Sequence, residues 1–362
     1  MKTQPRAGVV GPGSIGQLHV ETLRSLGVPV LALVASSPES ARAHADRLQI
    51  PHAYDSVAAM ASSGEVDVVH VCTPNALHAA DAAAAIDAGC ELVCEKPLTL
   101  EVAQADDLLA RAQRAGVNGV VCYHYRYFAG IKAARALVQG GAVGEVRMLA
   151  GSYLSQELRQ VPPGHWLADA EIVGPSLSLA DVGVHWLDLA EHVSGLPIRA
   201  VMAQPAGTGE CKPFACGAAL LLRLGEGAVG SVLVSQDCPG VSSDELVLEV
   251  HGSAGSLRWS IGTGGERLCL RGEQDSPSPS PTCAESFQTG TERAFRGLFQ
   301  AAYAWFRGGV DEARSEPMPD QPGAPSCHAP SLLDGRHGVA ILAAALSSAS
   351  HGAWVDVPPP LS

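Results

Sequence analysis

The chain has 362 residues and a mass of 37.3 kDa, a length that predicts two domains. Hydrophobic residues make up 46% of it and charged residues 17%, which is typical of a globular protein with apolar material for two cores. The net charge of −13 argues against a nucleic-acid partner. No apolar stretch reaches the ~18 residues of a membrane span, and the first residues do not resemble a signal peptide. We therefore expect a cytoplasmic protein without a membrane partner.

The cysteines and the charges are both unevenly placed. None of the ten cysteines forms a Cys-x-x-Cys pair, and the closest spacings are Cys90/Cys94 and Cys211/Cys216. Buried free thiols are therefore expected, with neither disulfides nor a metal site. Residues 1–150 hold 12 basic and 14 acidic residues, whereas residues 151–362 hold 12 and 23. The second half thus carries nearly all of the net negative charge.

A glycine-rich turn follows the first predicted strand, residues 7–10. The motif Gly11-Pro12-Gly13-Ser14-Ile15-Gly16 is G-x-G-x-x-G, and an amphipathic helix from Ile15 to Leu26 follows it. The first glycine permits a tight turn, the second lets backbone approach a pyrophosphate, and the third lets helix pack on strand. The free N–H groups at the helix start then face the anion. This context predicts a dinucleotide site.

The second predicted strand, residues 30–34, ends where the adenosine ribose of a bound cofactor should lie. A carboxylate there would select NAD, but the chain has Ser36 and Ser37. Ser37 also fits the N-cap of a helix with Pro38 at its first position. No arginine follows directly to bind a 2′-phosphate, and Arg42 is one turn further on. The choice between NAD and NADP stays open.

The alternation of strands and helices continues as in a doubly wound parallel sheet. The loop Thr73-Pro74-Asn75-Ala76-Leu77-His78 should lie at the same sheet edge as the glycine turn, although Asn75 could simply cap the next helix. Thr99 can cap a helix of residues 100–115 that Gly116 ends. The predicted elements of this part are the strands 67–72, 92–94 and 118–123 and the helices 79–88 and 100–115.

Cys94-Glu95-Lys96-Pro97 ends the buried strand of residues 91–94. Open α/β sheets bind ligands at the carboxyl ends of their strands. A partly desolvated ammonium there can donate a hydrogen bond to a reacting oxygen and stabilise negative charge on it. The alternative is a surface lysine that ends a strand.

After about residue 127 the pattern changes, which predicts a dinucleotide-binding domain of residues 1–127 and a second domain of residues 128–362. A helix of residues 130–139 leads into longer strands of antiparallel character. Pro/Ser-rich segments near 275–282 and 316–330 are expected to be mobile loops. The predicted later elements are the strands 146–154, 218–224, 229–234 and 246–250 and a closing helix from Ser331 to about His351.

The chain contains, in this order, the motifs GPGSIG (11–16), CTPNALH (72–78), CEKP (94–97), YHYRY (123–127), DVGVHWLDL (181–189) and DGRHG (334–338). Together these six motifs resemble the Gfo/Idh/MocA family of NAD(P)-dependent oxidoreductases, which includes inositol dehydrogenases and glucose–fructose oxidoreductase. The resemblance covers most of the chain and implies a Rossmann domain plus an α/β domain with an open, mostly antiparallel sheet. It also implies that Lys96 is catalytic, that Lys96–Pro97 is a cis peptide, and that the chain forms a dimer or tetramer through the open sheet face.

The resemblance also matches Asp181 and His185 to the family's catalytic pair. On a helix, residues i and i+4 share a face, so Asp181 can orient the imidazole of His185, and Asp188 is a second candidate for that role. The alternative is a helix-face histidine satisfied by neighbouring carboxylates. Family members often have other residues in place of Ser155–Leu158 and His165–Leu167, so their substrates do not transfer to this chain.

These residues predict reversible hydride transfer between a secondary alcohol of a sugar or cyclitol and a nicotinamide. His185 would act as general base, Lys96 would bind the same oxygen, and Asp181 would fix the imidazole tautomer. The acidic second half suggests a cationic polyol such as an amino sugar or aminoglycoside-type intermediate, unless that acidity only serves solubility. Alternatives are a non-catalytic dinucleotide-sensing regulator and a reductase of a linear diol or imine. Other candidate cofactor residues are Thr73, Pro74, Asn75, His78 and Glu95, and other candidate substrate residues are His124, Arg126, Tyr153 and Trp166.

Overall fold

The computed structural model describes residues 4–162, 165–206, 217–241, 244–272, 278–279, 287–308 and 329–360. Contacts divide the chain into two units, the first made of Met1–Cys122 with Phe295–Arg336 and the second of Tyr123–Ala294 with His337–Ser362. Each unit is therefore built from two separate stretches of sequence. The predicted domain boundary at residue 127 stays a prediction.

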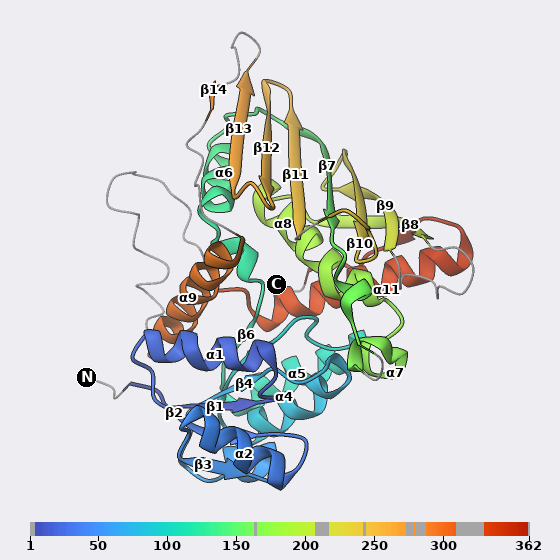
Figure 1. Ribbon diagram of the computed structural model, residues 1–362. Helices are drawn as coiled ribbons and strands as arrows, with labels where there is room; N and C mark the ends of the chain where they lie inside the picture. The colour runs from blue at the N-terminus through green and yellow to red at the C-terminus, as the bar shows by residue number, and fades with distance from the viewer. Residues whose placement is uncertain are drawn as a thin grey trace. The chain divides into compact units, whose positions relative to one another are not determined.

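The first unit contains a six-stranded parallel sheet in the order β3-β2-β1-β4-β5-β6. This is the doubly wound arrangement that the sequence predicted, with the glycine turn following β1 at the point where the strand order reverses. Residues of β1 and β4 are buried throughout, because helices cover both faces of such a sheet (Figure 1). The strands are β1 (Ala7–Val10), β2 (Val30–Val34), β3 (His52–Tyr54), β4 (Val68–Val71), β5 (Glu91–Cys94) and β6 (Gly119–Val121).

The helices of the first unit begin and end largely where the sequence predicted. Ser37 caps α2 with Pro38 at its first position, and Gly116 ends α5 in the left-handed conformation. The prediction for Thr99 was wrong: Glu101 is the N-cap of α5 and shares a capping box with Gln104, because the chain enters the helix two residues later. The helices are α1 (Ser14–Ser25), α2 (Pro38–Leu48), α3 (Val57–Ala61), α4 (His78–Asp87) and α5 (Val102–Ala115).

The long helix α9 (Phe287–Phe306) was not predicted, and its residues are divided between the two units. From Phe295 onward they belong to the first unit. Phe295, Phe299 and Tyr303 lie one turn apart along the helix, and rings of this series contact His19 and His70 of the same unit. The later part of α9 thus covers histidines of α1 and β4.

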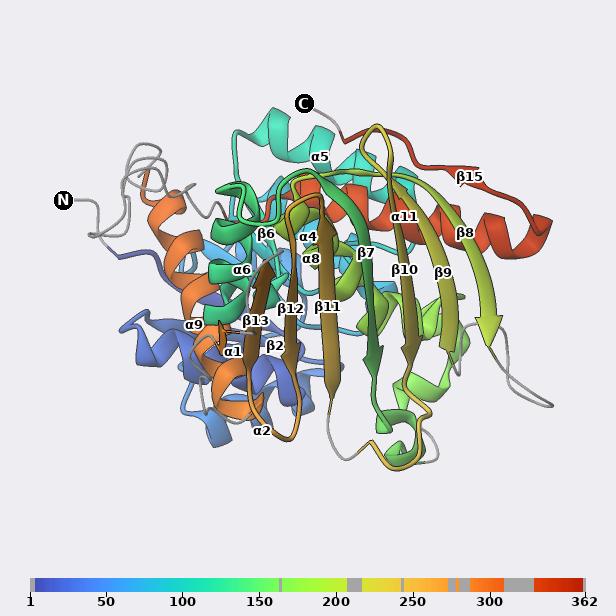
Figure 2. The same cartoon turned by 90° about the horizontal axis from the view of Figure 1, so that it is seen from above.

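The second unit contains a nine-stranded sheet in the order β14-β13-β12-β11-β7-β10-β9-β8-β15. It is mostly antiparallel, as predicted, and the pairing of β10 with β7 is parallel. Figure 2 looks onto one face of this sheet, and α6 (Ala129–Gln139) and α8 (Val184–Ser194) lie behind it. The strands are β7 (Val146–Leu154), β8 (Ile198–Ala206), β9 (Gly217–Leu224), β10 (Ala228–Ser235), β11 (Glu245–Gly252), β12 (Gly255–Ile261), β13 (Arg267–Gly272), β14 (Ser278–Pro279) and β15 (Val355–Asp356).

Side chains along β10 alternate between buried and exposed, because one face of the sheet packs against helices and the other does not. Large apolar side chains nevertheless stand on the exposed face. Met148, Leu221, Val229 and Leu233 are each about half exposed.

The two Pro/Ser-rich segments fall mostly outside the described residues. Within the first, Ser278 and Pro279 form β14 and pair with β13, which corrects the prediction of a loop at that point. Of the second, Ala329 and Pro330 are described. The closing helix α11 (Leu332–His351) is confirmed, and Ser331 precedes it with a hydrogen bond from its hydroxyl to Asp334. Among the described residues, no helix is long and apolar enough to cross a membrane.

Candidate functional site

The glycine turn of the first unit has no room for side chains at two of its three glycines. Gly11 has a φ of +82°, and a Cβ on it would lie 2.7 Å from the carbonyl oxygen of Cys72. A Cβ on Gly16 would lie 2.1 Å from the carbonyl oxygen of Gly11. These contacts hold the start of α1 tightly against the ends of β1 and β4, as the motif predicts.

Gly13 differs from both, because a Cβ built on it meets nothing within 4 Å. Gly13 is the N-cap of α1, so no side chain at the cap position bonds to the N–H groups of the first turn. No acidic residue lies in that turn. Gly13, Ser14 and Ile15 are exposed. This helix start is therefore open around Gly13 and has no competing carboxylate in its first turn, which fits a bound pyrophosphate.

The two serines after β2 have different environments. The hydroxyl of Ser37 accepts a hydrogen bond from the backbone N–H of Ser40 at 3.1 Å, so the capping interpretation of Ser37 is confirmed. Ser36 is exposed. The hydroxyl of Ser36 is consequently the better placed of the two to meet a ribose.

The loop after β4 is tied to the Lys96 segment by His78. Its Nδ1 lies 2.7 Å from the carbonyl oxygen of Pro97, and its Nε2 lies 2.7 Å from that of Thr73. Carbonyl oxygens only accept, so a neutral ring can bond to one of them and a protonated ring to both. Thr73 in turn donates from its hydroxyl to Asp81 at 2.8 Å. Leu77, not Asn75, is the N-cap of α4, so the capping alternative for Asn75 was wrong.

Lys96 lies two residues after the end of β5 and is half-buried. The Lys96–Pro97 peptide is cis, as the resemblance implied. The backbone N–H of Lys96 donates to Oε2 of its neighbour Glu95 at 3.2 Å. Because β1, β4 and β5 are adjacent and parallel, the glycine turn, the Thr73–His78 loop and Lys96 lie at one edge of the sheet.

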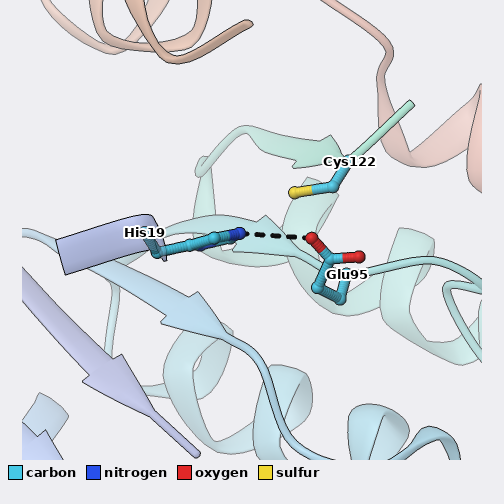
Figure 3. A group of neighbouring side chains, drawn as sticks. All are labelled: His19, Glu95 and Cys122. Carbon is cyan, nitrogen blue, oxygen red and sulfur yellow. Dashed lines mark hydrogen bonds and ion pairs between the residues drawn. The ribbon is translucent and has the colours of Figure 1, made fainter. Parts of the chain in front are cut away.

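Glu95 belongs to a buried group that Figure 3 shows with His19 of α1 and Cys122 after β6. Potential ligand atoms of the three side chains lie within 4.8 Å of one another, and Nε2 of His19 is 3.2 Å from Oε1 of Glu95. Burial and the charge of Glu95 raise the pKa of the Cys122 thiol well above its usual range. The thiol therefore keeps its proton beside the carboxylate.

In the second unit, His185 of α8 lies in a cluster of rings. Its ring centroid is 5.1 Å from that of His124 and 4.7 Å from that of Tyr125. The hydroxyl groups of Tyr125 and Tyr153 are 2.7 Å apart. Burial, with smaller effects from Asp244 and other neighbours, raises the pKa of both phenols well above 10, so both stay protonated. The structure thus brings together His124, Tyr153 and His185, which the sequence singled out, with Tyr125, which it did not.

Asp181 does not lie on a regular α-helix. Residues Leu179–Gly183 form a π-helical turn ahead of α8, so the i, i+4 geometry assumed from the spacing does not describe this segment. Oδ2 of Asp181 accepts a hydrogen bond from Nε2 of the buried Gln236 at 2.7 Å, and the same nitrogen lies 3.4 Å from a carboxylate oxygen of Glu157. Single π turns often occur at functional sites.

Two further candidates have structural partners. Arg126 donates to both carboxylate oxygens of Asp188, with nitrogen–oxygen distances of 2.5 to 3.1 Å, and the two side chains are only 12% and 7% exposed. Trp166 is half-buried and packs against a cluster that contains Leu167, Val173 and Leu177. Neither arrangement was predicted. Asp188 is 62 positions from Arg126, and the cluster that Trp166 packs against forms within its own segment.

Three residues of these groups were not singled out from the sequence. Gln236 follows the last residue of β10 and reads as an ordinary strand end. Tyr125 lies inside the YHYRY motif but was not singled out. His19 lies one turn beyond the glycine motif on α1, a spacing that could have drawn attention to it.

Comparisons with known proteins agree with this architecture. Residues 5–124 match the family model "Oxidoreductase family, NAD-binding Rossmann fold", and residues 131–258 match the GFO/IDH/MocA C-terminal domain. The chain is 26% identical over 283 residues to levoglucosan dehydrogenase of Pseudarthrobacter phenanthrenivorans, covering 69% of this chain and 72% of that protein. It is 25% identical over 257 residues to myo-inositol 2-dehydrogenase of Thermotoga maritima, covering 70% and 74%.

A solved structure resembles this protein in fold along nearly the whole chain. An inositol dehydrogenase homologue complexed with NAD+ from Azotobacter vinelandii matches with a TM-score of 0.83 and 25% identity, covering 98% of both chains. Both halves of the sequence thus match the same family, and the glycine turn has the form that its dinucleotide site requires. The chain belongs to the GFO/IDH/MocA family of NAD(P)-dependent oxidoreductases.

Proposed function

We propose that the protein oxidises, reversibly, a secondary hydroxyl group of a sugar or cyclitol to a ketone. The observation that carries this proposal is the shared sheet edge of the first unit. There, a helix start suited to a pyrophosphate follows β1, and the half-buried Lys96 follows β5. Only β4 lies between these two strands. The relatives named above, which act on levoglucosan and myo-inositol by their names, support a polyhydroxylated substrate.

The chemistry divides between the cofactor and the chain. The bound nicotinamide supplies the acceptor for the hydride. Lys96 donates a hydrogen bond to the substrate oxygen and stabilises the negative charge that develops on it. A ring nitrogen of His185 takes the hydroxyl proton, and Asp181 orients that ring. The proposal requires Lys96 and His185 to act on one hydroxyl group.

The remaining candidates have supporting roles. Gly11, Gly13, Ser14, Ile15 and Gly16 hold the pyrophosphate, and Thr73, Pro74, Asn75, His78 and Glu95 line the nicotinamide side. His124, Tyr153 and Trp166 face the substrate, whereas the ion pair with Asp188 favours a structural role for Arg126. Ser36 meets the adenosine ribose, with neither a repelling carboxylate nor an adjacent arginine beside it.

Calorimetric titration with NAD and NADP tests this view of the adenosine site. Affinities that differ by less than ~10³, about 4 kcal/mol, are expected. A larger preference for either cofactor would mean that another group of the protein contacts the 2′-position of the adenosine ribose.

An aminated substrate is favoured by a specific observation. The carboxylates of Glu157 and Asp181 approach the same amide nitrogen of Gln236, and those of Asp181, Glu157 and Asp244 all raise the pKa of Tyr125. Negative charge is therefore concentrated beside the ring cluster that contains His185. Such a concentration would attract an ammonium group on the substrate.

We also propose a homo-oligomer and a cytoplasmic location. The half-exposed Met148, Leu221, Val229 and Leu233 on the open sheet face would be covered by a second copy of the chain. The free thiols among the described residues, such as Cys90, Cys94 and Cys122, fit a reducing compartment.

A turnover assay with a panel of sugars, cyclitols and their aminated derivatives tests the proposed reaction. Reduced nicotinamide, followed by its absorbance, should form with at least one member of the panel. The isolated product should be a ketone. Binding of the cofactor without turnover on any polyol, linear diol or imine would instead favour a sensing regulator.

A further inference from the structure

A line of hydrogen bonds crosses the interior of the first unit and ends on Glu95. The hydroxyl of Tyr303 lies 3.0 Å from Nε2 of His70, and Nδ1 of His70 lies 3.0 Å from Nδ1 of His19. Nε2 of His19 lies 3.2 Å from Oε1 of Glu95. Both histidines are completely buried, and Tyr303 is 3% exposed. Three elements, α9, β4 and α1, thus contribute one side chain each to a continuous line.

The positions of the protons in this line follow from the states of His70 and Glu95. Burial and the neighbouring His19 lower the pKa of His70 well below 6.5, so its ring is neutral and carries one proton. The carboxylate of Glu95 accepts the backbone N–H of Lys96 and lies beside the protonated thiol of Cys122, so it is the acceptor at its end. His19 must therefore donate from Nε2.

Two arrangements remain for the contact between the histidines. With His19 neutral, its Nδ1 accepts from Nδ1–H of His70, and Nε2 of His70 accepts from the hydroxyl of Tyr303. With His19 as an imidazolium, both of those bonds reverse. The thiol of Cys72 lies 3.2 Å from Nδ1 of His19, and burial raises its pKa well above 9, so it retains a proton to donate. In the first arrangement this thiol and Nδ1–H of His70 share the single lone pair of an unprotonated Nδ1, and this is the arrangement that we adopt.

We infer that Tyr303, His70 and His19 form a one-directional hydrogen-bond chain, Tyr303→His70→His19→Glu95, that positions the Glu95 carboxylate and through it the Lys96 segment. The inference rests on the proposed role of Lys96. The three residues are positioning residues, because none of them follows a strand end at the ligand-binding edge. The arrangement also places a proton on Nε2 of His19, so the dashed contact in Figure 3 is a hydrogen bond that His19 donates to Glu95.

The geometry explains why a remote hydroxyl group matters. Oε1 of Glu95 accepts the hydrogen bond from His19, and Oε2 accepts the backbone N–H of Lys96, so one carboxylate joins the two contacts. Without the Tyr303 hydroxyl, the His70 proton can move to Nε2, which leaves two facing acceptors at the Nδ1 atoms. His19 then turns its proton to Nδ1 and loses its bond to Glu95. Small displacements of this kind can cost a large part of the catalytic rate.

The direct test combines histidine NMR with kinetics on the full-length protein. In ¹⁵N-histidine spectra, wild-type His19 should be the neutral Nε2–H tautomer and His70 the neutral Nδ1–H tautomer. Tyr303→Phe, which removes only the hydroxyl, should shift both tautomers. It should lower kcat by about 10-fold, with the KM for substrate and the Kd for cofactor changed by less than about two-fold.

Matched variants distinguish the effect of losing a hydrogen bond in this series from the effect of losing ring packing. Phe299→Leu alters a ring that contacts both histidines, at 4.8 and 5.0 Å between centroids, but carries no hydrogen-bonding group. It should lower Tm and leave the tautomers and kcat unchanged. His70→Asn keeps a donor toward Nδ1 of His19 and should retain most of the activity, whereas His70→Leu should lose as much as Tyr303→Phe.

An imidazolium or an Nδ1–H tautomer of His19 in the wild type would overturn the assignment. Folded Tyr303→Phe and His70→Leu variants with wild-type kcat would overturn the positioning role. The proposed function fails by a different result, full activity of Lys96→Ala, which leaves the tautomers as assigned.

Discussion

The two units build their candidate sites in different ways. In the first unit, the glycine turn, the Thr73–His78 loop and Lys96 each lie within two residues of the end of a strand of one parallel sheet. In the second unit, the group around His185 contains Tyr125, Tyr153 and Gln236, which are at least 28 positions apart from one another in sequence. The parallel sheet collects its functional groups at one edge by topology alone. The second unit collects them by side-chain packing.

This difference determines what each site tolerates. In the first site, backbone N–H groups and glycines are proposed to bind the pyrophosphate. The backbone conformation therefore matters there more than the identity of nearby side chains. The second site depends on buried polar contacts between side chains, and each loss leaves a partner unsatisfied. Substitutions in the second unit should therefore mix effects on stability and activity, whereas those at the glycine turn should separate them.

The largest expected effect is on stability, at the pair of Arg126 and Asp188. Arg126→Met removes one partner of a nearly buried ion pair and should lower the free energy of unfolding by about 3–5 kcal/mol, because the carboxylate is left without its counter-charge. Denaturant titration measures this. The double variant Arg126→Met/Asp188→Leu should recover much of the loss. A stable Arg126→Met protein with a greatly raised KM would instead restore Arg126 to the substrate site.

The next effect is on turnover, at His185. His185→Ala should lower kcat by ~10² or more, the usual scale for a general base, with cofactor affinity unchanged. His251→Ala is the control, because this histidine is 41% exposed on β11 and should have no effect. Near-normal turnover of His185→Ala would make His185 a packing residue of the ring cluster.

The glycine turn offers a pair that separates binding from folding. Gly13→Ala places a methyl group in open space at the pyrophosphate position and should weaken cofactor binding by about 10-fold with little change in Tm. Gly16→Ala meets the Gly11 carbonyl and should cost about 1–3 kcal/mol of stability. Calorimetry with the cofactor and thermal unfolding of both variants make the comparison. Equal affinity for Gly13→Ala and wild type would move the pyrophosphate elsewhere.

The smallest expected effect concerns the charge of the substrate. If the carboxylates near Tyr125 attract an ammonium group, kcat/KM for an aminated sugar should exceed that for its neutral parent by a few-fold. The advantage should shrink as ionic strength rises. Steady-state rates on the two sugars at low and high salt measure it. Equal, salt-independent rates would leave the acidity of residues 151–362 as a surface property.

The sequence predicted the first unit well because each of its signals is local. Period, turn chemistry and capping residues identified β2 and α2 and the end of α5, and the glycine spacing placed the dinucleotide turn. Thr99 failed as a cap because Glu101 and Gln104 compete for the same helix start through a capping box. That competition depends on where the chain leaves the Lys96–Pro97 turn, which no local pattern specifies.

The second unit was less predictable because its decisive contacts are tertiary. The spacing of Asp181 and His185 suggested a regular helix, but a π-helical turn precedes α8. Asp188 was considered as a partner for His185, and the structure pairs it with Arg126, 62 residues away. The line from Tyr303 to Glu95 joins residues more than 200 positions apart, and only the fold brings α9 against β4.

The proposed mechanism depends most on Lys96, and one measurement tests the role of this residue directly. The rate of nicotinamide reduction in a single turnover should be recorded for Lys96→Ala and wild type at saturating cofactor, with the cofactor Kd measured separately. A fall of ~10² or more with an unchanged Kd is the expected result, since only the stabilisation of the developing alkoxide is lost. A reduction rate close to that of the wild type would contradict the proposed mechanism.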